Sequence, residues 1–183
     1  MPGPPRSART LLLSCLLVAT GCGSTEPEPL TAMPPAVPAD LCALVPETAR
    51  QGLLTNSSAD ESGNPTAACS LRSPDGAPTE VRAVVTWVQA NDEDSADNVL
   101  DSQCRAIDRT EFREQNGFRA EGAEKACAAT GSAKGRDSAT LAALSGREIV
   151  TVRLTSVPSG DQASLARAQE MLEGVLSSLA GDS

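Results

Sequence analysis

The most regular pattern in the chain is an alternation of apolar residues between Thr79 and Ala90. Side chains two positions apart share one face of a strand, so this period predicts a long β-strand. Its second face carries Val84 and Val88, which predicts a central strand covered on both sides. The first face carries Val81, Ala83, Val85 and Trp87.

Other strands are predicted where short apolar runs lie between turn-forming residues. Residues 73–76 read Ser-Pro-Asp-Gly and predict a tight turn before the long strand, and Ser145-Gly146 predicts a hairpin turn. Residues 55–66 are rich in Asn, Ser and Gly and predict a loop. The further strands are predicted at Ala67–Arg72, Lys125–Thr130, Ser138–Leu144 and Glu148–Thr155.

Apolar residues at steps of three and four predict two long helices. The first, Asp92–Arg109, has Cys104 on its apolar face, and the second runs from Ser159 to about Leu179. Residues 159–162 fit a capping box at the start of the second helix. A short helix is also predicted at Asp40–Leu44, where the aspartate is a suitable N-cap.

These elements follow the order helix, two strands, helix, about three strands, helix. Strands joined by tight turns pair antiparallel, and amphipathic helices cover the resulting sheet. We therefore expect residues 40–183 to form a single α+β domain. Its antiparallel sheet should have about four to six strands, with helices packed mainly on one face.

The start of the chain is organised differently. Residues 1–21 contain two arginines, a short apolar run and then small residues, which is the order of a secretory signal peptide. The segment Ala19-Thr20-Gly21-Cys22 resembles the lipobox of bacterial lipoproteins, with alanine where leucine is usual. The resemblance implies that Cys22 carries a diacylglycerol thioether and anchors the protein at the extracytoplasmic face of the cell membrane. Ordinary secretion with Cys22 as a free or paired thiol is the alternative.

Residues 22–39 follow the predicted cleavage site and contain five prolines with few apolar side chains. Such a composition cannot bury a core and predicts a flexible, partly extended tether. The apolar run before it is far shorter than the roughly 20 residues that a membrane-spanning helix needs. We expect the lipid to be the contact with the membrane.

Four cysteines remain in the predicted domain: Cys42, Cys69, Cys104 and Cys127. An even number in an exported domain predicts two disulfides, for which three connectivities exist. We favour Cys42–Cys69 and Cys104–Cys127, because each closes a short loop between a helix and a nearby strand. A zinc site is the alternative, but the chain has no histidine and no C-x-x-C spacing. No metal or cofactor is expected.

The amino-acid composition disfavours several classes of function. Removal of the signal leaves 13 basic against 24 acidic residues, a net charge of −11, which repels nucleic acid. One tryptophan, two phenylalanines and no tyrosine give little surface for stacking bases or sugars. The absence of histidine excludes ordinary Ser–His and Cys–His catalysis within the chain.

Carboxylates are the remaining candidates for catalysis. Asp92, Glu93, Asp94, Asp97 and Asp101 cluster at the start of a predicted helix, where a glycosidase-like acid pair is conceivable. Acids at a helix start are also favoured by the helix dipole and are usually solvated. We therefore expect no catalytic residue and keep a carboxylate-based envelope hydrolase as the alternative function.

The start of the domain, Asp40-Leu41-Cys42-Ala43-Leu44-Val45-Pro46-Glu47, resembles the opening motif of a family of small actinobacterial lipoproteins, the domain of unknown function numbered 3558. Cys69 followed by Leu71 is similar to the second cysteine motif of that family. The layout also resembles sensor domains of actinobacterial receptor kinases, which are α+β folds with two disulfides. Neither resemblance supplies a catalytic residue. The expected function is a non-catalytic binding, sensing or accessory module, with an envelope protein or a small ligand as partner.

Overall fold

Residues 36–108, 113–133, 135–157 and 162–181 are described in a computed structural model of the chain. The predicted signal peptide, Cys22 and most of the predicted tether lie outside these ranges, as does Ser159 of the predicted capping box. Pro35–Ser183 form one compact unit. No helix among the described residues is long and apolar enough to cross a membrane.

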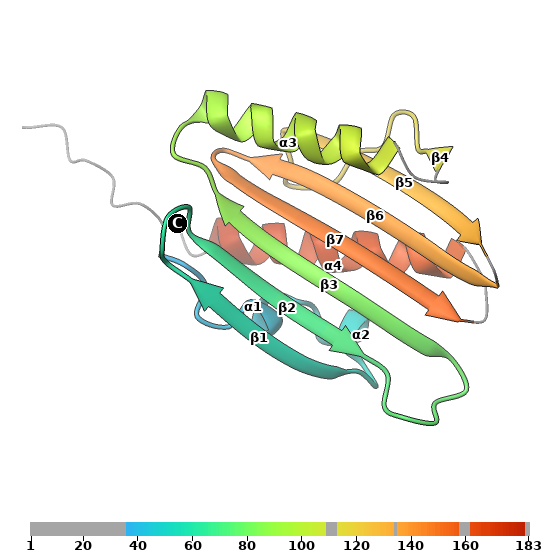
Figure 1. The fold of residues 1–183 in the computed structure, drawn as a ribbon. Coiled ribbons are helices and arrows are strands. Elements are labelled where there is room, and N and C mark those ends of the chain that lie inside the picture. The colour runs from blue at the N-terminus through green and yellow to red at the C-terminus, as the bar shows by residue number, and fades with distance from the viewer. Residues whose placement is uncertain (1–35, 109–112, 134, 158–161, 182–183) are drawn as a thin grey trace, which may run out of the picture. The chain divides into compact units, whose positions relative to one another are not determined.

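The described domain is built on one seven-stranded sheet with the order β1-β2-β3-β7-β6-β5-β4 (Figure 1). All neighbouring strands pair antiparallel, which confirms the predicted α+β class. The strands are β1 (Leu54–Asp60), β2 (Thr66–Arg72), β3 (Glu80–Gln89), β4 (Arg113–Glu114), β5 (Lys125–Ala133), β6 (Arg136–Ser145) and β7 (Glu148–Val157). The helices are α1 (Leu41–Leu44), α2 (Glu47–Arg50), α3 (Glu93–Asp108) and α4 (Gln162–Gly181).

The main core lies between one face of the sheet and the helices α4 and α1, which cover that face. Trp87 of β3 is fully buried there, together with Leu141 of β6 and Val152 of β7, against Met171 and Leu172 of α4. Trp87 belongs to the alternating positions that the sequence assigns to one face of this strand. Burial of each large apolar side chain contributes about 1.5–3 kcal/mol to folding. The main core contains most of these side chains, so it supplies most of the hydrophobic stabilisation.

A second, smaller core lies on the opposite face, where α3 packs on β5, β6 and β7. Ala96 and Leu100 of α3 contact Ala142, Leu144 and Ile149 there. Neighbouring positions on the same strands, such as Ala143 and Val150, belong to the main core. The helices therefore lie mainly on one face, as predicted, with α3 alone on the other (Figure 1).

Both predicted disulfides are present. Cys42 of α1 is bonded to Cys69 of β2, and Cys104 of α3 is bonded to Cys127 of β5. The first bridge is buried and the second is half-buried. Each bridge joins a helix to the strand beneath it, so one disulfide staples each face of the sheet.

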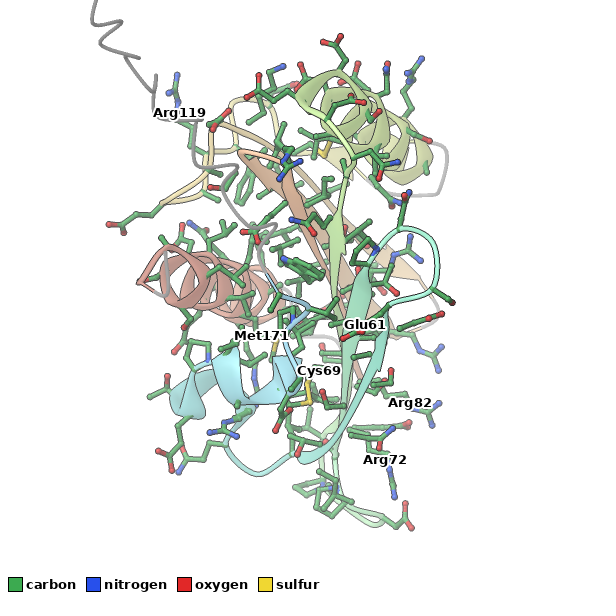
Figure 2. The ribbon with its side chains drawn as sticks, turned by 90° about the vertical axis from the view of Figure 1, so that its left-hand side faces the viewer. Glu61, Cys69, Arg72, Arg82, Arg119 and Met171 are labelled. Atoms are coloured by element: carbon green, nitrogen blue, oxygen red, sulfur yellow. A yellow bond between two sulfur atoms is a disulfide. The ribbon has the colours of Figure 1, made fainter. Side chains whose placement is uncertain are left out.

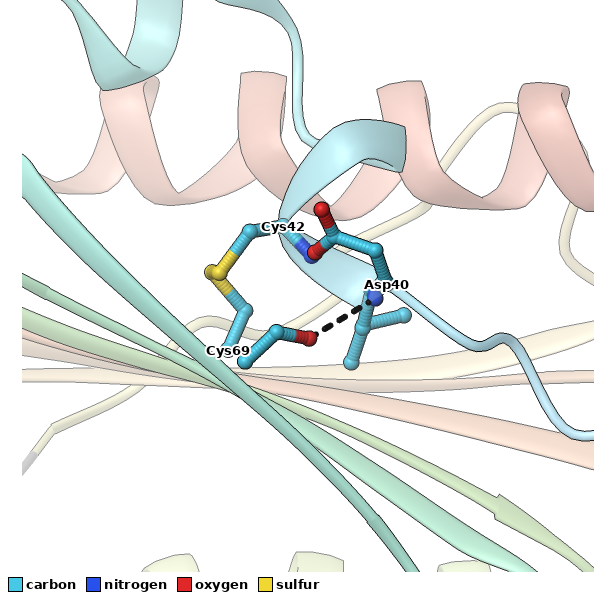
Figure 3. The surroundings of a disulfide bond; sticks show 5 residues. Asp40, Cys42 and Cys69 are labelled. Carbon is cyan, nitrogen blue, oxygen red and sulfur yellow. Dashed lines mark hydrogen bonds between the residues drawn. A yellow bond between two sulfur atoms is a disulfide. The ribbon is translucent and has the colours of Figure 1, made fainter.

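Helix α1 has only four residues and depends on local contacts for its position. Asp40 caps it, with a carboxylate oxygen that accepts a hydrogen bond from the Cys42 amide at 3.0 Å. The Leu41 amide donates to Ser57 Oγ of β1 at 3.1 Å, beside the disulfide (Figure 3). These bonds satisfy helix-start amides that have no partner within the helix.

Two predictions about individual strands were wrong. Residues 55–66 do not form a loop throughout, because Leu54–Asp60 pairs along its whole length with β2. The second face of β3 is not covered, because α3 packs on the same face of the sheet but over β5, β6 and β7, and Val84 is 40% exposed. The strand is central in the sheet, but one of its faces is open to solvent.

Candidate binding surface

The α3 side of the sheet is only partly covered, because α3 packs on β5, β6 and β7. We call the uncovered part the open sheet face. It lies on the α3 side of β1, β2, β3 and the second half of β7, as strand alternation and register assign it. Its members are Leu54, Asn56 and Ser58 of β1, Ala68, Ser70 and Arg72 of β2, Arg82, Val84 and Thr86 of β3, and Arg153 and Thr155 of β7.

Exposed apolar side chains concentrate on this face. Leu54 is 46% exposed and Val84 is 40% exposed, and they are the large hydrophobic residues that the described chain leaves open to solvent. They come from the edge strand and from the middle of the sheet, with Ser70 and Arg72 on the strand between them. Single exposed apolar residues are ordinary, but the presence of both on one face of the sheet marks that face as a candidate contact surface.

Arginines are the second feature of the open sheet face. Arg72 lies directly opposite Arg82 in the β2–β3 register. Figure 2 shows both side chains on the side of the sheet away from Met171 of α4. Arg153 of β7 lies opposite Val84, which is two residues after Arg82 in β3. Like charges directly opposite one another on neighbouring strands destabilise a sheet, so this placement is costly for folding alone.

Two exposed ion pairs offset part of that cost. Arg72 contacts Asp75 at 3.3 Å, and Arg82 contacts Glu80 at 2.6 Å. All four side chains are about half exposed or more, so each pair contributes little and can exchange partners. None of the ion pairs between described residues includes Arg153.

The β2–β3 connection adds a hollow at one end of this surface. It has a volume of about 310 Å³ and is lined by Arg72 and Arg82 together with the turn. Gly76 takes a left-handed conformation there, with φ of 81°, as the predicted Ser-Pro-Asp-Gly turn requires. Because guanidinium groups bind carboxylates and phosphates in a bidentate way, the hollow and the open sheet face beside it can hold an anionic group.

The acidic cluster considered for catalysis lies at the start of α3. Asp92 caps that helix by accepting a hydrogen bond from the Ser95 amide at 2.7 Å, which lowers the pKa of its carboxyl. Asp97 forms an exposed ion pair with Lys125 at 2.6 Å. Asp92 thus serves as a helix cap, and Asp97 is paired with a cation of β5. No group of three or more cysteine, aspartate or glutamate side chains that could hold a metal occurs among the described residues.

A half-buried polar cluster lies at the other end of β3, on the α4 side. Gln89 is directly opposite Glu148 of β7, and its Nε2 has no hydrogen-bond partner among the described residues. Burial raises the pKa of Glu148, while Trp87 and Arg147 oppose the rise. Across the β3–β7 pair Glu148 faces Gln89, which does not titrate, so this register places no acid–base couple there.

Glu148 should make stability depend on pH. A carboxyl with a pKa that is higher in the folded than in the unfolded protein stabilises the fold below the unfolded value, and this contribution is lost as pH rises through the folded pKa. We therefore expect E148Q to be more stable than the wild type at pH 7, with the difference vanishing near pH 4. Urea unfolding at both pH values measures this. Equal differences at both pH values would contradict it.

The arginines were not identified as a site from the sequence. Arg72, Arg82 and Arg153 are scattered through the chain, and only strand pairing brings them onto one face. The sequence does show that these arginines lie at the strand positions that alternate with apolar, core-facing residues, and such positions point to solvent. Comparisons with protein-family models, curated proteins and solved structures find no match for this chain.

Proposed function

We propose that the protein is a lipoprotein anchored to the extracytoplasmic face of the cell membrane through Cys22, and that its domain is a non-catalytic binding module. The support for the anchor is the signal-like residues 1–21 and the lipobox-like segment before Cys22. We also propose membership of the actinobacterial lipoprotein family that the start of the domain resembles. Two disulfides in one small domain are typical of exported proteins.

The observation that carries the binding role is the open sheet face. It combines exposed aliphatic side chains with arginines on one face of the sheet, and arginine is enriched in protein–protein interfaces. Small-molecule sites are usually concave and mainly apolar, whereas the hollow at the end of this face is lined mainly by charged and polar residues of the β2–β3 connection. The proposed partner is therefore a protein of the cell envelope.

The alternative, a carboxylate-based hydrolase, has less support. A glycosidase-like site needs two carboxyl groups, one of them with a raised pKa so that it can act as an acid. Asp92 has a lowered pKa and serves as a helix cap. Asp97 is paired with Lys125.

Site-specific crosslinking in the native host tests the proposal. A photoreactive residue at exposed Ser70, on the open sheet face, should crosslink to an envelope protein, whereas one at exposed Ala180 of α4 should not. Added domain should compete, and the V84D domain should not. In C22A, the protein should leave the membrane fraction.

Crosslinking from both positions alike, or from neither, would refute the binding surface. Retention of C22A in the membrane fraction would refute the anchor, independently of the crosslinks.

A further inference from the structure

We infer that the open sheet face binds an acidic, extended segment of its protein partner, with carboxylates lying between the guanidinium groups of Arg72 and Arg82. The inference rests on the proposed function and names the chemistry of the partner. The first observation that supports it is the concentration of positive charge on one face of an acidic protein. The mature chain has a net charge of −11, yet three arginines gather on this face.

The register of β2 and β3 gives the second basis. Arg72 and Arg82 occupy directly opposite positions, where side chains start about 5 Å apart. A carboxylate placed between them converts a repulsive pair into two attractive contacts. The present partners, Asp75 and Glu80, come from the turn and the strand start and are exposed enough to be displaced.

The dimensions of the face suit a polypeptide. The row Leu54, Arg72, Arg82 and Thr155 crosses four neighbouring strands. Three strand spacings amount to about 14 Å, which is the length of about four residues of extended chain. The hydroxyl group of exposed Ser70 on this face can donate a hydrogen bond to such a segment, and exposed Val84 can contact its apolar atoms.

The same observations disfavour an anionic bilayer as the occupant. A bilayer surface is much larger than the open sheet face, so it experiences the electrostatic field of the whole protein. A protein with a net charge of −11 is repelled by anionic lipid. A short acidic segment meets mainly the local field of the arginines, because charges beyond about 8 Å are screened at physiological salt.

The direct test uses residues 22–183 with the substitution C22A, which carry neither the predicted signal peptide nor a lipid, and a labelled hexaglutamate peptide as probe. Binding should be saturable, and R72E/R82E should weaken it about tenfold or more. R72K/R82K should weaken it by less but measurably, since lysine cannot form the bidentate contact. The matched control is R105E/R119E, which changes net charge equally at exposed arginines outside the open sheet face and should bind the peptide like the wild type.

Several results would overturn the inference. They are no saturable binding, an equal loss in R105E/R119E, or binding of hexaglutamine as tight as that of hexaglutamate. Arginine-dependent binding to phosphatidylglycerol vesicles without peptide binding would assign the face to lipid, and arginine-dependent self-association in sedimentation would assign it to a second copy. If the Ser70 crosslink persists in R72E/R82E, the proposed function stands and only the acidic partner is refuted.

Discussion

Removal of the Cys42–Cys69 disulfide by the double substitution C42A/C69A is expected to destabilise the domain by about 3.5 kcal/mol. The bridge closes a loop with a sequence separation of 27 residues, and the chain-entropy estimate for a loop of this size has that magnitude. Loss of two fully buried sulfur atoms adds to the cost, since Cys42 and Cys69 are only 3% and 0% exposed. Urea unfolding at equilibrium measures the effect.

The second bridge provides the matched control. Cys104–Cys127 closes a loop of 23 residues, so its entropic contribution is within a few tenths of a kcal/mol of the first. Its cysteines are half-buried and pack beside the smaller core under α3. We therefore expect C104A/C127A to cost about 3 kcal/mol, less than C42A/C69A. A larger loss in C104A/C127A would contradict the assignment of α1 and β2 to the main core.

The same difference in burial predicts the order of reduction. Under native conditions a small thiol reductant should open Cys104–Cys127 first, because access limits thiol–disulfide exchange. Alkylation followed by peptide mapping identifies which cysteines are released. This measurement uses the unmodified domain and is independent of any folding defect in the variants.

The disulfides and the main strands follow from local features of the sequence. The alternation at Val81–Trp87 and the Ser145-Gly146 turn fix β3 and the β6–β7 hairpin, because period and turn chemistry act over short distances. The cysteine spacings favour the observed pairing for a similar reason, since each bridge closes a short loop.

Strand β1 shows where local reasoning fails. Leu54–Asp60 has no apolar alternation, and only Ser57 in it is even half-buried. Its strand conformation comes from the ladder with β2 and from the contact of Ser57 with the α1 amide. Both are tertiary contacts, which override local propensity.

The candidate binding surface was hidden for a related reason. Apolar residues on both faces of β3 predict two covered faces, but they do not say where a crossing helix ends. Because α3 packs on β5, β6 and β7, Val84 remains exposed. The pairing of Arg72 with Arg82 depends on the register of the β2–β3 hairpin, which composition does not specify.

Replacement of Gly174 by alanine is expected to destabilise the domain even though alanine is the better helix former. Gly174 lies inside α4 at the point where Pro46, before α2, packs against it. A Cβ atom at this position would lie 2.1 Å from Pro46 Cγ, far inside the contact distance of two carbon atoms. The proline ring is rigid, so the backbone between α1 and α2 must move.

That segment has little freedom to move, because other contacts hold it on α4. Arg167 of α4 donates hydrogen bonds to the carbonyl oxygens of Ala49 and Gln51 at 2.7 and 3.2 Å. The disulfide at Cys42 fixes α1 to β2. Displacement of Pro46 would therefore strain both attachments, which lie on either side of it in the sequence.

Opposing terms set the size of the G174A effect. Overpacking of a tight contact costs about 1–3 kcal/mol, and the change from glycine to alanine in a helix recovers up to about 1 kcal/mol. We expect a net loss of about 1–2 kcal/mol and a decrease in Tm of roughly 2–8 °C. Thermal unfolding followed by circular dichroism measures it.

Gly181 supplies the matched control for the close approach at Gly174. It is the last residue of the same helix, and an added Cβ there would meet nothing within 4 Å, so G181A should cost no stability. The double variant P46A/G174A removes the ring carbons that collide with the new methyl group and should recover part of the loss. If G174A is as stable as G181A, or if P46A adds its cost to G174A without recovery, the contact between α4 and Pro46 does not determine how α2 docks. Recovery in the double variant would instead show that the ring of Pro46 occupies the space that a side chain at position 174 would need, so that glycine is required at 174 because proline is present at 46.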